Sequence, residues 1–240
     1  MRKKVQRYLI TPSIYRIKFP RIFAIGDIHG CVKTFKKLLF DEIRIQKTDK
    51  IFCVGDYIDR GKDSKGVIDV ILDLREKGYS IQTLMGNHEE MLLKAAQDVT
   101  KLELWIKNGG NATLRSFKIS NLDDLPVKYL NFFRDTKYYI TTSKYIFVHA
   151  GLNFNLDNPF LDKKAMLWTR DTEYDLLKAK GRIVIHGHTP TPISKIKLQV
   201  QSHNINIDSG CVYSNKKGRG YLTAIQLPQK RFISIKNIDG

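Results

Sequence analysis

The fold of this chain is constrained most by a strand–helix pattern that repeats in its N-terminal part. Three short apolar runs, at residues 21–25, 50–54 and 80–85, each stop directly before a glycine. We expect a helix after each run, and the interval between runs fits one strand–helix–strand unit of about 30 residues. The pattern therefore predicts an α/β fold in which parallel strands are joined by helical crossovers.

The rest of the chain is richer in strands. Further strand-like runs lie at 138–141, 145–150, 182–187, 205–208, 221–227 and 231–235. Several follow short turns, so we expect the later part of the sheet to be mixed or antiparallel. Residues 98–135 interrupt this rhythm with a polar, Gly- and Asn-containing stretch, which we interpret as a mainly helical insertion that can cover a cleft. We expect a single domain over 21–240, preceded by a basic leader over residues 1–20.

Polar side chains follow five of the predicted strands. They lie in the segments GDIHG (Asp27, His29), GDYIDRG (Asp56, Asp59, Arg60), GNHE (Asn87, His88), VHAG (His149) and HGHTP (His188). Ligands of open α/β sheets bind beyond the carboxyl ends of the strands, so these groups converge on one rim if the strands are neighbours. Taken alone, His149 and His188 could also be core or loop histidines with ordinary hydrogen-bond partners and no function. Five such segments in order at this spacing favour a functional site.

The oxygen and imidazole ligands at this rim predict a metal site. Oxygen atoms come from Asp27, Asp56 and Asn87, nitrogen atoms from three histidines, and no cysteine belongs to the set. Such a mixture suits Mn, Fe or Zn better than calcium or a structural zinc. Six ligands exceed what one ion with open positions needs. Two ions that share Asp56 as a bridge would use all of them.

Together these motifs resemble the phosphoprotein-phosphatase family of calcineurin-like metallophosphoesterases, most of all its compact bacterial and phage serine/threonine phosphatases. The resemblance covers residues 21–227. It implies a two-sheet β-sandwich flanked by helices, which is more specific than one doubly wound sheet. It also implies two divalent metal ions, most of all Mn, with Fe or Zn as alternatives. The implied ligands are Asp27 and His29 for the first ion, Asp56 for both, and Asn87, His149 and His188 for the second.

The same resemblance assigns roles in catalysis. His88 matches the family's general acid and Asp59 its orienting partner, while Arg60 and Arg170 match the clamps that bind phosphate together with Asn87. A hydroxide that bridges the two metals would attack phosphorus directly. The planar guanidinium group of arginine can donate two hydrogen bonds to phosphate oxygens. A nearby protonated imidazole can donate a proton to a poor leaving group.

The resemblance leaves the substrate open between two classes. We expect a phosphomonoesterase acting on phosphoserine or phosphothreonine in proteins, with a dinucleoside polyphosphate (Ap4A-type) hydrolase as the alternative. Relatives of the second kind share GDIHGC, GNHE and the WIKNGG segment at 105–110, but tend to lack the acid at Asp59. A nuclease is disfavoured because Thr189 and Pro190 stand where such enzymes carry a further histidine. The complete ligand set argues against a catalytically silent binding module.

Charge and cysteine content give the remaining expectations. The 41 Lys and Arg residues outnumber 24 Asp and Glu by 17, which points to an anionic partner. We expect that partner to be a phosphorylated protein or peptide, or a small phosphate ester, rather than a nucleic acid. No apolar run approaches the roughly 20 residues of a membrane span. Three cysteines, an odd and sparse count, indicate a reducing compartment, so we expect a cytoplasmic protein.

Several other residues have two interpretations at this stage. His186 either supports the site or belongs only to its strand, and Asp208 either supports a ligand histidine or forms an Asx turn. We expect Glu89 and Glu90 to stabilise a helix start through its dipole. We expect Trp105 to pack within the insertion rather than to contact substrate.

Overall fold

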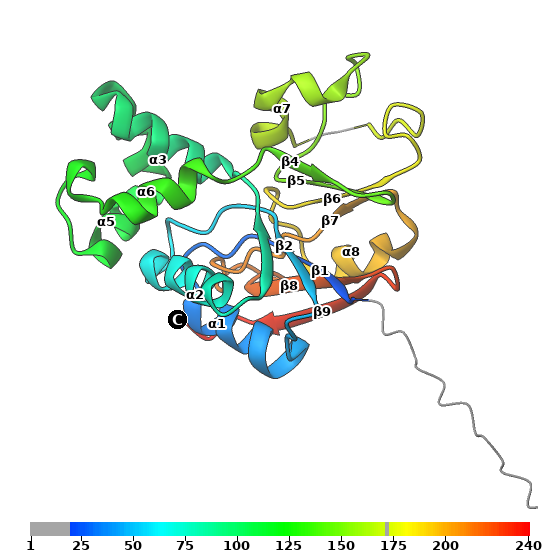
Figure 1. Ribbon diagram of the computed structural model, residues 1–240, viewed down its shortest axis with the longest axis horizontal. Coiled ribbons are helices and arrows are strands. Elements are labelled where there is room, and N and C mark those ends of the chain that lie inside the picture. The colour runs from blue at the N-terminus through cyan, green and yellow to red at the C-terminus, as the bar shows by residue number, and fades with distance from the viewer. Residues whose placement is uncertain (1–19, 171–172) are drawn as a thin grey trace, which may run out of the picture.

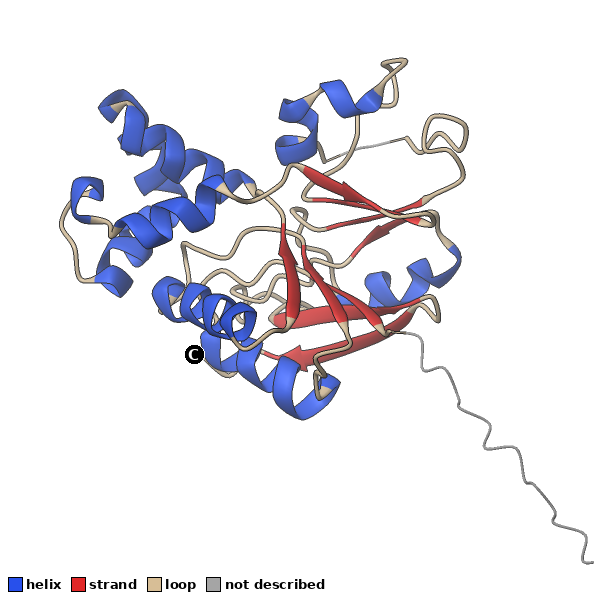
Figure 2. Ribbon diagram, viewed as in Figure 1, coloured by secondary structure: helices blue, strands red, loops and turns tan. Residues whose placement is uncertain are grey.

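The computed structural model describes residues 20–170 and 173–240 and shows two β-sheets with helices around them (Figures 1 and 2). The predicted basic leader lies outside the described residues, apart from Pro20. The first sheet has the order β3 (Ser80–Thr83), β2 (Lys50–Cys53), β1 (Ile22–Ile25), β8 (Tyr221–Leu227) and β9 (Arg231–Lys236). The second has the order β4 (Tyr139–Thr141), β5 (Tyr145–Val148), β6 (Ile183–His186) and β7 (Asn204–Asn206).

Both sheets are mixed. Strands β1, β2 and β3 are parallel, with Ile25 opposite Cys53 and Cys53 opposite Thr83. Strand β8 runs antiparallel to β1, and β9 antiparallel to β8. In the second sheet β5, β6 and β7 are parallel and β4 is antiparallel to β5. The parallel N-terminal crossovers and the mixed later part are thus confirmed, and they lie in two sheets, as the family resemblance implied.

The two sheets pack face to face over an apolar core. Side chains alternate along β2, so Phe52 points between the sheets while Ile51 and Cys53 point to the outer, helix-covered face. The ring of Phe52 stacks on that of Phe147 from β5 with centroids 4.0 Å apart. Because both faces of β1 and β2 are buried, their sequences are continuous apolar runs rather than alternating ones.

Helices cover the outer faces (Figure 2). They are α1 (Val32–Lys37), α2 (Ser64–Glu76), α3 (Asn87–Gln97), α4 (Leu102–Trp105), α5 (Asn111–Phe117), α6 (Val127–Arg134), α7 (Lys163–Trp168) and α8 (Ile193–Lys197). Single π-helical turns are η1 (Leu38–Ile43) and η3 (Ile106–Gly110), and 3₁₀ turns are η2 (Val99–Lys101), η4 (Leu122–Asp124), η5 (Pro159–Leu161) and η6 (Leu198–Gln201). Among the described residues, no helix is long and apolar enough to cross a membrane.

The segment 98–135 is mainly helical, as predicted. It contains α4, α5 and α6, which pack against α2 and α3 at one side of the first sheet (Figure 1). Gly109 has a φ of 109° and interrupts the helical run between α4 and α5. Because only glycine adopts such a φ readily, this residue sets the turn that directs α5 back toward α2.

Candidate active site

The motif loops at the strand ends contain an unusual number of left-handed residues. His29, Asp56, Asp59, Arg60 and His188 all have φ values between 47° and 69°. For a non-glycine residue this conformation costs about 1–3 kcal/mol, and it persists only where the surrounding contacts enforce it. The backbone is therefore held in a shape that aims these side chains toward one another.

Glycines allow the loops after β2, β3 and β5 to touch. A Cβ atom on Gly55, whose φ is 115°, would lie 2.8 Å from both Gly86 Cα and His149 Nδ1. No real Cβ makes contacts that short, so any other residue would separate the three loops. The glycines that end the predicted strands are thus required by the close approach of the motif loops.

The first cluster of ligand atoms contains His29, Asp56 and His88. His29 Nδ1 lies 2.8 Å from the carbonyl oxygen of Ile58, which can only accept, so Nδ1 carries the proton. The lone pair of His29 Nε2 then faces the site, 3.4 Å from Asp56 Oδ2. A backbone carbonyl that fixes the tautomer in this way is the usual partner of a metal-binding histidine.

The second cluster contains Asp56, His149 and His188, with Asn87 beside them. His149 Nδ1 donates to Val54 O at 3.0 Å, which leaves the Nε2 lone pair 3.0 Å from Asn87 Oδ1 and 3.5 Å from Asp56 Oδ1. His188 Nδ1 lies 3.0 Å from the same Asn87 oxygen. These nitrogen and oxygen lone pairs point at one another, and too few protons lie between them to form hydrogen bonds. A bound cation would remove that repulsion. Asp56 offers one oxygen to each cluster, so the residues suit two neighbouring ions.

Burial keeps the imidazoles in the form that binds metals. It lowers the pKa of His188 to about 3, and it also lowers the pKa values of His29 and His149. These rings are therefore neutral near pH 7, with lone pairs available for a metal.

Asp27 joins the clusters through the backbone of His188. Its two carboxylate oxygens lie 3.2 and 3.1 Å from the N–H of His188, which donates to them. Burial, Asp208 and Asp56 together raise the pKa of Asp27 well above its usual range. A cation bound between these carboxylates would offset the repulsion between their negative charges. The charge distribution therefore also fits a metal.

His88, a member of the first cluster, forms a buried pair with Asp59. His88 Nδ1 donates to Asp59 Oδ2 at 2.7 Å, and neither residue is exposed to solvent. The other ring nitrogen, Nε2, lies 4.0 Å from Asp56 Oδ2 and has no hydrogen-bond partner within the described chain. This atom therefore faces Asp56, the residue that the two clusters share.

The two predicted clamps border the site differently. Arg60 Nη1 donates to His29 Nε2 at 2.7 Å, and its guanidinium lies 5.6 Å from the ring centroid of Tyr213. Arg170 is exposed, and its charge contributes to the low pKa of His188, for which burial is the main cause. Arg60 is therefore inside the constellation, whereas Arg170 lies on its rim.

The structure decides between the interpretations of two secondary candidates. Asp208 Oδ1 accepts the N–H of Gly210 at 2.7 Å, which is an Asx turn, and its charge also acts on Asp27. His186 Nδ1 lies 3.2 Å from Gly187 O, next to the strand, and His186 belongs to neither ligand cluster.

Three residues have contacts that the sequence patterns did not indicate. Glu89 is in the first turn of α3, as expected, but its carboxylate also accepts from the backbone of the Asp56 loop. Trp105 is buried as expected, yet it donates to Asp59, as does Thr113. Their partners are 32 to 54 residues away in the chain, so no local motif could have revealed these contacts.

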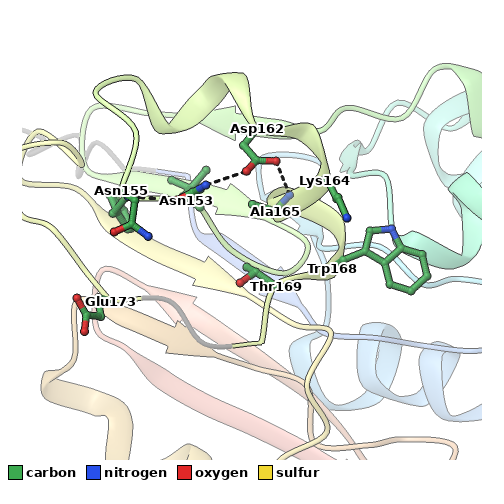
Figure 3. A pocket seen from close by; sticks show the side chains of 10 residues that line it. Asn153, Asn155, Asp162, Lys164, Ala165, Trp168, Thr169 and Glu173 are labelled. Atoms are coloured by element: carbon green, nitrogen blue, oxygen red, sulfur yellow. Dashed lines mark hydrogen bonds between the residues drawn. The ribbon is translucent and has the colours of Figure 1, made fainter.

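A hollow of about 590 Å³ opens beside α7 (Figure 3). Asn153 Nδ2 donates to Asp162 at its wall, and the Trp168 indole points away from Asn153 and Asn155. None of the predicted ligands lines it. We therefore assign it no part in the chemistry.

Comparison with known proteins agrees with this geometry. The family model described as calcineurin-like phosphoesterase matches residues 20–217. A bis(5'-nucleosyl)-tetraphosphatase PrpE [asymmetrical] of Oceanobacillus iheyensis is 28% identical over 90% of this chain and 92% of its own. Serine/threonine-protein phosphatase 1 of Salmonella typhimurium is 38% identical, but over only 38% of this chain and 39% of its own. A solved serine/threonine phosphatase of Saccharomyces cerevisiae shares the fold, with a TM-score of 0.62, 14% identity, and coverage of 92% of this chain and 81% of that one.

Proposed function

The chain belongs to the calcineurin-like phosphoesterase family, and from this premise we propose that it hydrolyses dinucleoside tetraphosphates with the help of two divalent ions. The observation that carries the chemistry is the pair of ligand clusters that share Asp56, with His88 Nε2 4.0 Å from Asp56 Oδ2. The tetraphosphatase relative aligned over nearly the whole of both chains favours this substrate. Manganese is the ion we expect.

The roles of the side chains follow from their positions. When bound, two divalent ions would lower the pKa of a shared water for attack on phosphorus and offset charge on the phosphoryl oxygens. His29 Nε2 would hold a metal through the lone pair that Arg60 Nη1 contacts at 2.7 Å, and the guanidinium would then be able to bind phosphate. His88 donates a proton to the leaving oxygen, and Asp59 orients its ring.

A second cationic side chain near Arg60 supports a substrate with several phosphates. Lys216 Nζ lies 4.7 Å from the ring centroid of Tyr213, the same ring that Arg60 contacts. Arg60 and Lys216 therefore both lie near the Tyr213 ring. We propose that one phosphate binds at the clusters and that a further phosphate of the same substrate meets Lys216.

Phosphoserine and phosphothreonine peptides are the second candidate substrate. The hydrogen-bonded pair Asp59–His88 favours it, because a serine alkoxide is a poor leaving group that needs a proton donor more than a nucleotide does. The similarity to the Salmonella phosphatase points the same way, over a smaller part of the chain.

One parallel assay tests this proposal. Metal-free protein is reloaded with Mn, Fe or Zn and offered dinucleoside tetraphosphate, phosphopeptides and short RNA. We expect the highest kcat/KM with the tetraphosphate and Mn, and no turnover without metal. Faster hydrolysis of the phosphopeptides would establish the second candidate instead, and metal-independent turnover would contradict both.

Replacement of the proton donor tests its role separately. His88→Asn should lower kcat for a phosphoserine peptide by about 100- to 10,000-fold, the range of general acid catalysis. His203→Asn is the matched control, because His203 is exposed and stacks on Tyr174 away from the ligand clusters. A His88→Asn variant as active as the control would remove His88 from the mechanism.

A further inference from the structure

We propose that Trp105 and Thr113 are positioning residues for proton donation, because they fix the Asp59 carboxylate that holds the ring of His88. The inference rests on the proposed function in one respect, namely that His88 protonates the leaving oxygen. It assigns to the helical insertion a part in the chemistry, although neither ligand cluster contains a residue of that insertion.

The Asp59 carboxylate is fixed by donors from three helices. Oδ2 accepts from His88 Nδ1 of α3 at 2.7 Å and from Trp105 Nε1 of α4 at 2.9 Å. Oδ1 accepts from Thr113 Oγ1 of α5 at 2.6 Å. Asp59 has no solvent exposure, so water does not compete for these oxygens. The plane of the carboxylate, and through it the direction of the His88 ring, is set by Trp105 and Thr113.

Thr113 also holds the backbone of Asp59. The N–H of Asp59 donates to Thr113 Oγ1 at 3.0 Å and lies 3.1 Å from Ser64 Oγ, and the two hydroxyl oxygens are 3.0 Å apart. Asp59 has a φ of 69°, a costly conformation for an aspartate. One threonine side chain therefore stabilises both the strained backbone and the carboxylate of the same residue.

The loop between Trp105 and Thr113 is shaped to place them on this carboxylate. Gly109 O accepts the N–H of Arg60 at 3.3 Å, which ties the loop to the residue after Asp59. Gly110 lies against the indole of Trp105, where a Cβ atom would be 2.5 Å from Cδ2. The Asn-Gly-Gly stretch thus brings the insertion against the Asp59 loop more closely than other residues would allow.

Simple packing is the competing explanation. Trp105 is wholly buried in an apolar cluster, and a buried indole N–H needs some acceptor. Packing predicts that loss of the N–H affects stability and all substrates equally. Positioning predicts a selective effect, because a misplaced proton donor matters most when the leaving group is poor.

The test uses full-length, metal-loaded enzyme and a series of aryl phosphates from p-nitrophenyl phosphate to phenyl phosphate. Trp105→Phe removes the N–H and Thr113→Val removes the hydroxyl with little change of shape. Each should slow phenyl phosphate hydrolysis by roughly 10- to 100-fold, as loss of an orienting hydrogen bond does. The rate with p-nitrophenyl phosphate should fall only a few-fold, so the dependence on leaving-group basicity steepens.

Two matched variants remove a buried hydroxyl elsewhere in the same helical region. Tyr129→Phe loses the bond to Asp69, and Thr136→Val loses the bond to Phe133 O. Both should keep the wild-type leaving-group dependence. In a His88→Asn background, Trp105→Phe should add no further steepening, because the group it positions is gone.

The possible outcomes separate the two proposals. An equal fall across the series, or no change in either variant, overturns the positioning role. Additional steepening in the His88→Asn background also overturns it. Wild-type enzyme that hydrolyses no phosphate ester overturns the proposed function itself. If Trp105→Phe fails to fold, as thermal melting would show, Thr113→Val alone decides.

Discussion

Glu89 shows how one buried side chain can connect two motif loops. Its Oε2 accepts from the N–H groups of Asp56 at 2.9 Å and Gly86 at 3.0 Å, and Oε1 accepts from Tyr57 at 2.8 Å. The side chain is completely buried. A carboxylate offers enough lone pairs for all of these donors, so Glu89 locks the Asp56 loop onto the start of α3.

Glu89→Gln should therefore destabilise the protein and weaken metal binding. The amide nitrogen would face N–H groups that need an acceptor, at a cost of about 3 kcal/mol or a Tm lower by roughly 6–12 °C. Glu90→Gln is the control in the same turn, because its remaining oxygen can still accept from Trp168. Thermal melting and metal content per chain measure the two effects. Equal Tm values for the two variants would refute this role.

At the residue scale, the sequence marks the candidate ligands more clearly than the side chains that support them. Asp27, His29 and Asp56 are candidates because glycine and a strand end mark them locally. Glu89 and Trp105 could not, because their partners are 33 and 46 residues away and depend on how α3 and α4 pack. Local chemistry identifies a ligand, whereas orientation is a property of tertiary contacts.

At the element scale, strands were easier to predict than short helices. The strands β1 and β2 are buried on both faces, so nearly all of their residues are apolar and each strand is visible in the sequence as a continuous apolar run. Helices such as α4, with residues Leu102–Trp105, and α7, with Lys163–Trp168, are too short for a clear periodicity. They depend on capping and on neighbouring elements instead. The division into two sheets came from the family resemblance rather than from any periodicity.

Helix α7 illustrates this dependence, because one aspartate begins it. Asp162 accepts from Ala165 N at 2.8 Å and from Asn153 Nδ2 at 2.9 Å (Figure 3). Asp162→Ala should lower the free energy of unfolding by about 1 kcal/mol, the usual value of an N-cap. The exposed Asp157, on the same loop, gives the control Asp157→Ala.

The effect of this cap should depend on pH. The bond from Asn153, followed by that from Ala165, holds the pKa of Asp162 below its usual range. A carboxyl with a lowered folded-state pKa stabilises the protein above its unfolded pKa of about 4, and the stabilisation disappears as pH falls through the folded value. Urea unfolding at pH 7 and below about pH 4 should show the gap between Asp162→Ala and wild type narrowing. A constant gap would contradict a charge-dependent cap.

At the scale of the whole molecule, the excess of 17 positive charges lies mostly outside the site. The site sets the acids Asp27, Asp56 and Asp59 against Arg60 and Arg170. The surplus of positive charge therefore does not come from the candidate site. Its physical effect is a positive field around the molecule, which raises the encounter rate with anions over distances set by ionic strength.

This field predicts a salt effect that grows with substrate charge. Between about 10 mM and 500 mM NaCl the screening length shrinks severalfold, so kcat/KM for a dinucleoside tetraphosphate should fall by roughly tenfold. The value for p-nitrophenyl phosphate, which carries fewer charges, should fall less, while kcat at saturation stays nearly constant for both. Stopped assays across the salt series measure these values at fixed Mn concentration. An equal fall for both substrates would mean that salt acts on metal binding or on the site itself, and that the surplus charge has no part in substrate capture.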